Sequence, residues 1–149
     1  MILVVRISGD TNLDSDIRET LNRLRIRRKY ASTLIIEKDK IKMGMLKKVK
    51  HYVMYSEVED NLIKKLIEKR GQTLNGKKVD EKQVETILEA IKKGDWKIKK
   101  FFRLHPPIGG FKKSTKQTYP AGILGENKNL IKLVEKMLWK SKKEKKLVE

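Results

Sequence analysis

Apolar residues near the start of the chain fall into short continuous runs separated by stretches of helical spacing. Runs rich in β-branched and aromatic residues predict β-strands at 2–7, 33–37 and 52–58. Between them, apolar residues recur at every third or fourth position, which predicts two amphipathic helices. The first run is almost entirely apolar, so we expect its strand to lie in the centre of a sheet. Residues 1–58 therefore form a β-α-β-α-β core.

Polar residues at the expected helix starts support this reading. Asp14 or Ser15 is a candidate N-cap for the first helix, and Asp39 is one for the second. Gly44 lies inside the second helix, where glycine costs about 1 kcal/mol relative to alanine. We expect this glycine to permit a close packing contact.

From residue 59 the pattern becomes helical. Residues 59–95 predict two helices, the first ended by Gly71 and the second begun at Asp80, and we interpret them as a helical insertion that packs on the core. Residues 126–140 predict a final amphipathic helix, followed by a lysine-rich tail at 141–149. The predicted fold is a single α+β domain over the whole chain, with a small three-stranded sheet.

The stretch 96–125 has a different composition. It contains all three prolines and all three phenylalanines of the chain, together with the pair Gly109–Gly110. Paired prolines cannot continue a helix or serve an inner strand, so we predict an irregular basic loop. We expect its phenylalanines to lie mostly in the core and its lysines to carry the function.

Charge narrows the range of functions. The chain has 37 Lys and Arg against 19 Asp and Glu, a formal net charge of +18 and a pI near 10.0. Such a protein favours a polyanionic partner, and RNA, DNA and an anionic membrane surface are the candidates. No run of apolar residues approaches the length of a membrane span, and the N-terminus does not resemble a signal peptide. We therefore expect a cytoplasmic protein without a membrane partner.

The basic residues gather in three places: after the first helix, along the second helix, and in the loop. Cations neutralise phosphates, and aromatic rings beside them can stack on exposed bases. Four cations within residues 25–29 also exceed what the end of a helix needs, which favours contact with a polyanion over capping. The candidate RNA-binding residues are Arg25, Arg27, Arg28, Lys29, Lys47, Lys48, Lys50, Lys99, Lys100, Arg103, His105, Lys112, Lys113 and Lys116.

The sequence offers no set of catalytic residues. Its two histidines, His51 and His105, lack metal-ligand spacing, and there is no cysteine to form a disulfide or a thiolate site. The segment Gly109–Ser114 lacks the first glycine of a phosphate-binding loop. We predict no enzymatic activity, no metal, no cofactor and no small-molecule substrate.

Two segments resemble a known family. They are Gly44–Val53, which reads Gly-Met-Leu-Lys-Lys-Val-Lys-His-Tyr-Val, and Phe101–Lys116, which reads Phe-Phe-Arg-Leu-His-Pro-Pro-Ile-Gly-Gly-Phe-Lys-Lys-Ser-Thr-Lys. Together they closely resemble the large-subunit ribosomal protein thirty family in its longer archaeal form, which is related to eukaryotic large-subunit protein seven. The resemblance covers essentially the whole chain, whereas bacterial members match only about the first 58 residues.

The resemblance implies a three-stranded antiparallel sheet with two helices, somewhat like a ferredoxin fold. It also implies assembly into the large ribosomal subunit, contacts with the large ribosomal RNA and with neighbouring ribosomal proteins, and a position near the 5S RNA. The alternative is a generic nucleic-acid or chromatin-type binding protein that uses the same charges on duplex DNA. A small ferredoxin-like enzyme or regulator is disfavoured by the charge and by the lack of catalytic residues.

Overall fold

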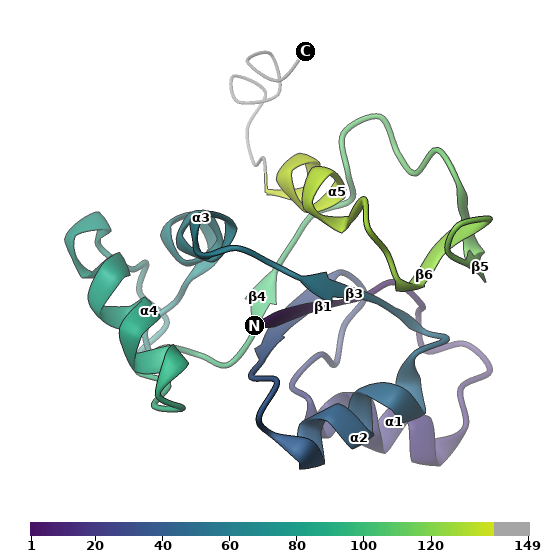
Figure 1. Cartoon of the computed structure of the whole chain (residues 1–149), viewed down its shortest axis with the longest axis horizontal. Coiled ribbons are helices and arrows are strands. Elements are labelled where there is room, and N and C mark those ends of the chain that lie inside the picture. The colour runs from purple at the N-terminus through teal and green to yellow at the C-terminus, as the bar shows by residue number, and fades with distance from the viewer. Residues whose placement is uncertain (139–149) are drawn as a thin grey trace.

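The computed structural model describes residues 1–138, which form an open six-stranded sheet with five α-helices (Figure 1). The strands are β1 Ile2–Arg6, β2 Ala31–Ile35, β3 Val53–Glu57, β4 Phe102–Arg103, β5 Ser114–Thr118 and β6 Gly122–Glu126. The helices are α1 Ser15–Arg23, α2 Lys40–Val49, α3 Asp60–Arg70, α4 Val84–Lys92 and α5 Leu130–Met137, and a 3-10 turn, η1, spans Glu81–Gln83.

The three strands predicted from the start of the chain form the middle of the sheet. β1 lies between β2 and β3 and is antiparallel to both, with Ile2 opposite Ile35 on one side and Glu57 on the other. Both faces of β1 are covered, since Leu3 and Val4 point to opposite faces and are fully buried. This explains why its sequence is apolar without alternation, and it confirms the α+β core and the central position of the first strand.

The sheet continues beyond this core in the order β4-β2-β1-β3-β6-β5. β4 adds antiparallel to β2, and β6 adds parallel to β3. β5 pairs with β6 through an irregular ladder in which the register shifts between Ser114 and Thr118. The prediction of an irregular loop over 96–125 was therefore wrong for these segments, because the outer edges of β2 and β3 offer backbone partners to any extended stretch. The paired prolines and glycines fall between β4 and β5.

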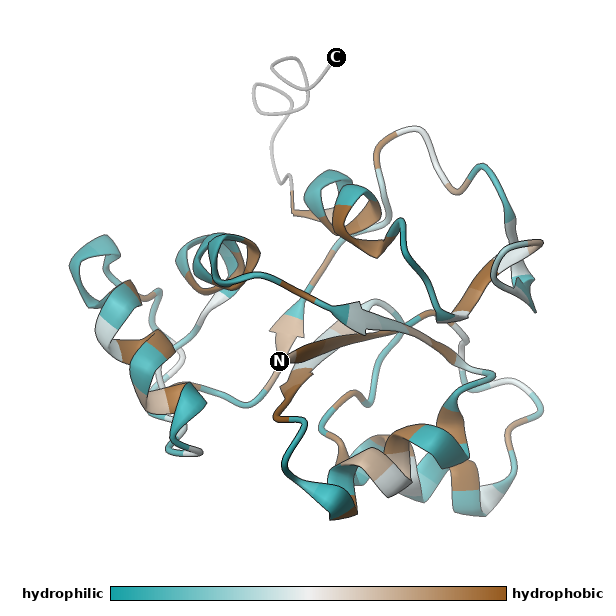
Figure 2. Cartoon of the chain, in the orientation of Figure 1, coloured by the Kyte–Doolittle hydropathy of each residue, from teal (hydrophilic) through white to brown (hydrophobic). Residues whose placement is uncertain are grey.

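Helices cover both faces of the sheet (Figure 1). α1 and α2 pack on one face, where Leu21 and Leu46 join Val4 in one apolar cluster. α3 and α5 pack on the other face, where Ile63 and Val134 share a second cluster. Figure 2 shows that these helices contain both apolar and polar segments, and their apolar residues contribute to the two clusters. The buried side chains of α3 and α4 also belong to this second cluster.

The final helix is shorter than predicted. The sequence pattern indicated 126–140, but β6 takes up the first residue of that range and α5 begins only at Leu130. The last positions of the predicted helix and the basic tail at 141–149 lie outside the described residues. Within residues 1–138, no helix is both long enough and apolar enough to cross a membrane.

The expected close contact at Gly44 is absent from the described structure. Asp39 caps α2 as predicted, since its carboxylate accepts a hydrogen bond from the Lys42 backbone N–H at 3.2 Å. Gly44, however, is exposed, and a methyl group placed on it would have no described atom outside its own helix within 4 Å. The glycine therefore weakens α2 without a packing gain.

We expect Gly44→Ala to raise the free energy of unfolding by about 1 kcal/mol, because alanine loses less backbone freedom when a helix forms. Thermal unfolding followed by circular dichroism measures the effect, and a rise of about 2–4 °C corresponds to this energy for a chain of this size. A loss of stability would instead show that α1 and α2 approach each other more closely in solution.

Candidate nucleic-acid interface

The basic turn between α1 and β2, residues 24–30, separates apolar from charged side chains. Leu24 and Ile26 are buried, whereas Arg25, Arg27 and Arg28 are exposed. The helix ends where the Ile26 N–H donates to the Leu21 carbonyl at 3.1 Å. The alternation anchors the turn in the core and leaves the cations in solvent.

Arg25 has a backbone conformation that usually favours glycine. Its φ is +67°, in the left-handed region, which costs other residues roughly 1–2 kcal/mol. An arginine at the position that ends a helix therefore destabilises the turn relative to glycine.

β4 brings a distant part of the chain to this turn. Arg103 lies opposite Ala31 in the ladder, and the Leu104 N–H donates to the Tyr30 carbonyl at 3.2 Å. Side chains two residues apart in an extended segment share a face, so Phe101 and Arg103 point the same way while Phe102 between them is fully buried. The guanidinium carbon of Arg103 lies 5.6 Å from the centre of the Phe101 ring.

These two segments enclose a pocket, which we call the arginine pocket. Its volume is about 340 Å³, and the described residues that line it include four arginines, one aromatic ring and no carboxylate. Clustered charges of one sign against an apolar wall concentrate the positive potential. The lining residues are Arg25, Arg27, Arg28, Ala31, Phe101 and Arg103.

A smaller hollow of about 110 Å³ adjoins the arginine pocket and shares Arg25 with it. It lies along β2, and Lys42 of α2 and Lys100 before β4 contribute to its wall. The Lys100 backbone is fixed there, because the Thr33 hydroxyl donates to its carbonyl at 2.8 Å. Arg23 also lines this hollow, but its guanidinium already pairs with Glu19 at 2.6 Å. The sequence interpretation missed Arg23 and Lys42.

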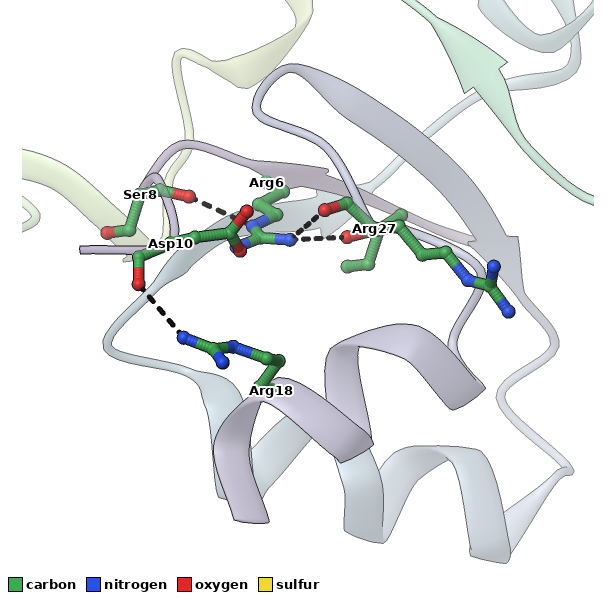
Figure 3. Close-up of polar contacts among 6 residues, drawn as sticks. Arg6, Ser8, Asp10, Arg18 and Arg27 are labelled. Carbon is green, nitrogen blue, oxygen red and sulfur yellow. Dashed lines mark hydrogen bonds and ion pairs between the residues drawn. The ribbon is translucent and has the colours of Figure 1, made fainter. Parts of the chain in front are cut away.

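A buried arginine at the end of β1 holds the basic turn in place (Figure 3). The Arg6 side chain is only 1% exposed, and its Nη1 donates to the Ile26 carbonyl at 3.1 Å and to the Arg27 carbonyl. Its Nε donates to the Ser8 carbonyl at 2.9 Å, and its Nη2 binds the Asp10 carboxylate at 2.7 Å. Arg6 thus draws the carbonyls of the turn inward, which leaves the arginine side chains outside.

The sequence interpretation missed Arg6 because it treated 2–7 as an apolar strand. The available signal was a lone arginine inside that run, since a cation in a buried strand needs several acceptors. Neither its partners nor its link to residues 26 and 27 could be read from local pattern.

The Arg6 guanidinium lowers the pKa of Asp10, first through the hydrogen bond and then through its charge. A carboxyl whose pKa is lowered by folding contributes stability above its ordinary pKa of about 3.9, and this contribution disappears as the pH falls through the folded value.

We expect Asp10→Asn to lower the unfolding temperature at pH 6 and to have a much smaller effect near pH 2. Thermal unfolding at both pH values measures this difference, and Asp95→Asn, at an exposed position beyond α4, is the control. An effect of Asp10→Asn that does not change with pH would contradict the ion pair.

A second basic hollow, which we call the lysine pocket, lies between α5 and the glycine-rich connection from β4 to β5, residues 104–113. Its volume is about 240 Å³, and its walls include Lys112 and Lys113 from the connection and Lys132 and Lys136 from α5. Lys113 is held in place, since its Nζ donates to the Pro120 carbonyl at 2.9 Å. The two α5 lysines were missed, although their spacing of four residues places them on one helix face.

An aromatic contact links the connection to the basic turn. The Tyr30 and Phe111 rings stack with their centres 6.2 Å apart, and the Lys29 ammonium lies 5.3 Å from the Tyr30 ring centre. Of the three phenylalanines, only Phe102 is fully buried, whereas Phe101 and Phe111 are half-buried.

The remaining candidate residues lie outside these pockets. Lys47, Lys48 and Lys50 are exposed on or just after α2, and Lys48 shares a groove with Asp16 and Glu19 of α1. Lys99 lies beside Gly76 and Gln72, and Lys116 is exposed on β5. The backbone N–H of His105 donates to the Met137 carbonyl. Within residues 1–138, no cluster of three or more His, Asp or Glu side chains is arranged to hold a metal ion.

Comparison with known proteins identifies the family. The model of the family described as "Ribosomal protein L30p/L7e" matches residues 2–53, which run from β1 to the start of β3. The large ribosomal subunit protein uL30 of Cenarchaeum symbiosum (strain A) is 37% identical over 151 residues, covering 91% of this chain and 97% of the relative. The uL30 protein of Nitrosopumilus maritimus (strain SCM1) is 34% identical and covers 92% of this chain and 97% of its own. That of Korarchaeum cryptofilum (strain OPF8) is 35% identical, with coverages of 93% and 95%. The protein therefore belongs to the L30p/L7e family of ribosomal proteins, and its match to archaeal uL30 proteins over more than 90% of the chain is the basis for this assignment.

Proposed function

We propose that the protein is a structural constituent of the large ribosomal subunit and that it binds ribosomal RNA. The observation that carries this proposal is the arginine pocket, in which four arginines from two distant segments converge around a half-buried ring. The archaeal relatives are each named as a large ribosomal subunit protein, which supports the large subunit as the assembly that this protein joins. The role is structural rather than catalytic.

Guanidinium groups suit this task because each presents several fixed N–H donors that match phosphate oxygens in pairs. The arginine pocket and the adjoining hollow form one basic surface along β2, and the lysine pocket forms another beside α5. Concave basic sites favour irregular, folded RNA, whose backbone segments can enter them. The proposed partners are the large-subunit ribosomal RNA near the 5S RNA and neighbouring ribosomal proteins, in the cytoplasm.

Sedimentation tests the proposal directly. Cell lysate is run on a sucrose gradient before and after a high-salt wash, and the protein is followed by immunoblot. We expect it to sediment with the large subunit in a one-to-one ratio and to resist the wash. Release at moderate salt, or a peak with DNA or at the top of the gradient, would contradict the proposal and favour a generic nucleic-acid or chromatin-type binding protein.

A further inference from the structure

Phe101 is the residue of the arginine pocket that electrostatics does not explain. Binding of phosphate alone needs cations, yet a half-buried ring forms part of the wall. The fold can bury such a ring, since the adjacent Phe102 is fully buried. Phe101 instead faces the cations, with the Arg103 guanidinium carbon 5.6 Å from its ring centre.

An aromatic ring and a planar guanidinium on one wall form a surface on which a nucleobase can stack. The other wall carries Arg25, Arg27 and Arg28 of the basic turn, whose guanidinium groups can bind a phosphate beside that base. The volume of about 340 Å³ is at the low end of the roughly 300–1,000 Å³ typical of small-molecule pockets. A mononucleotide unit fits this space, whereas a stacked duplex does not enter it.

We infer that the arginine pocket binds one unstacked nucleotide of the RNA, with its base against Phe101 and its phosphate among the arginines of the basic turn. This inference rests on the proposed RNA-binding function. It adds that the part of the RNA inside the pocket is a single unstacked nucleotide. The nucleotide belongs to a polymer rather than to a free ligand, because the basic surface continues past the pocket to Lys42 and Lys100, whose ammonium groups can bind neighbouring phosphates.

A fluorescent RNA hairpin tests this inference. One hairpin carries a single bulged 2-aminopurine, and its partner has the same sequence fully paired. We expect the full-length protein to bind the bulged hairpin about 5- to 150-fold more tightly, the range that one base–aromatic stack contributes, and to quench the 2-aminopurine fluorescence. Adenosine monophosphate alone is the probe for the free-ligand alternative, and we expect it to bind far more weakly than the bulged hairpin.

Variants of the rings complete the design. Phe101→Leu keeps an apolar side chain but removes the stacking surface, so it should bind both hairpins equally, with the dependence of affinity on salt unchanged because the charge stays the same. Phe101→Tyr should restore the preference, and Phe111→Leu, which alters a ring outside the pocket, should retain it. Circular dichroism confirms that each variant is folded.

The outcomes separate this inference from the proposed function. Equal binding of the two hairpins by the wild-type protein, or a full preference in Phe101→Leu, would overturn the nucleotide pocket and leave RNA binding in place. Binding of adenosine monophosphate as tight as that of the bulged hairpin would overturn the assignment to a polymer. If the protein bound neither of the two hairpins and also failed to bind protein-free large-subunit RNA, the proposed function itself would be overturned.

Discussion

Replacement of Arg6 by methionine is expected to lower the free energy of unfolding by about 3 kcal/mol. Methionine fills a similar length of the strand but donates no hydrogen bond, so the carbonyls of Ser8, Ile26 and Arg27 lose their donor. Each buried carbonyl left without a partner costs about 1–3 kcal/mol, and water recovers part of this at the edge of the site. The unfolding temperature should fall by about 6–12 °C.

Denaturant and thermal unfolding of the full chain measure this effect. Arg18→Met is the matched control. Arg18 is exposed, and its Nη2 donates a hydrogen bond to the Asp10 backbone carbonyl at 3.2 Å. We expect this control to change stability by less than about 0.5 kcal/mol. Wild-type stability in Arg6→Met would show that the basic turn does not depend on the buried guanidinium.

Reduced RNA affinity of folded Arg6→Met is a second expected result, since the arginine pocket loses the support of its backbone.

The second large effect is expected from removing charge in the arginine pocket. The triple variant Arg25→Asn, Arg28→Gln and Arg103→Gln removes three positive charges, and asparagine tolerates the left-handed backbone of residue 25. We expect affinity for protein-free large-subunit RNA to fall about 100-fold or more at moderate salt, because a hydrogen bond to a charged group contributes about 1.5–3 kcal/mol. The slope of log affinity against log salt should decrease by about 2–3, since each phosphate that the protein no longer neutralises lowers it by about 0.7–0.9.

The control removes the same charge elsewhere. Lys77, Lys78 and Lys82 are exposed in and after the connection from α3 to η1, and none of them lines either basic pocket. Their replacement by glutamine should leave the salt slope nearly unchanged. Filter binding over a series of salt concentrations measures both variants. An equal decrease in affinity for the two variants would mean that net charge, and not the arginine pocket, determines RNA affinity.

Much of the fold could be predicted from local pattern. β1, α1, β2, α2 and β3 have continuous or periodic apolar residues, and their positions agree with the sequence prediction to within a few residues. β4, β5 and β6 were not predicted, since 96–125 was assigned to an irregular loop. β4 has only two residues, and β5 reads Ser-Thr-Lys-Gln-Thr, in which no apolar alternation exists. Both form because the outer strands of the sheet offer them backbone partners.

The candidate site was predicted in its components but not in its assembly. Charge and spacing identified Arg25, Arg27, Arg28 and Arg103 as members of separate basic clusters. Their convergence depends on the pairing of β4 with β2, which is a long-range contact that no local pattern contains. The same limit applies to Arg6, since two of its acceptors, the carbonyls of Ile26 and Arg27, lie about 20 residues further along the chain. Which basic residues contact RNA stays a prediction until the variants are measured.

The pairing of β4 with β2 also has a consequence for biosynthesis. The two walls of the arginine pocket are about 70 residues apart, as the hydrogen bond between Ser32 and Phe102 shows. A nascent chain that has reached only β3 carries the first wall, the basic turn, and not the second. The second wall arrives after Arg103 has been translated. An unfinished chain therefore lacks a complete arginine pocket until both segments have been made.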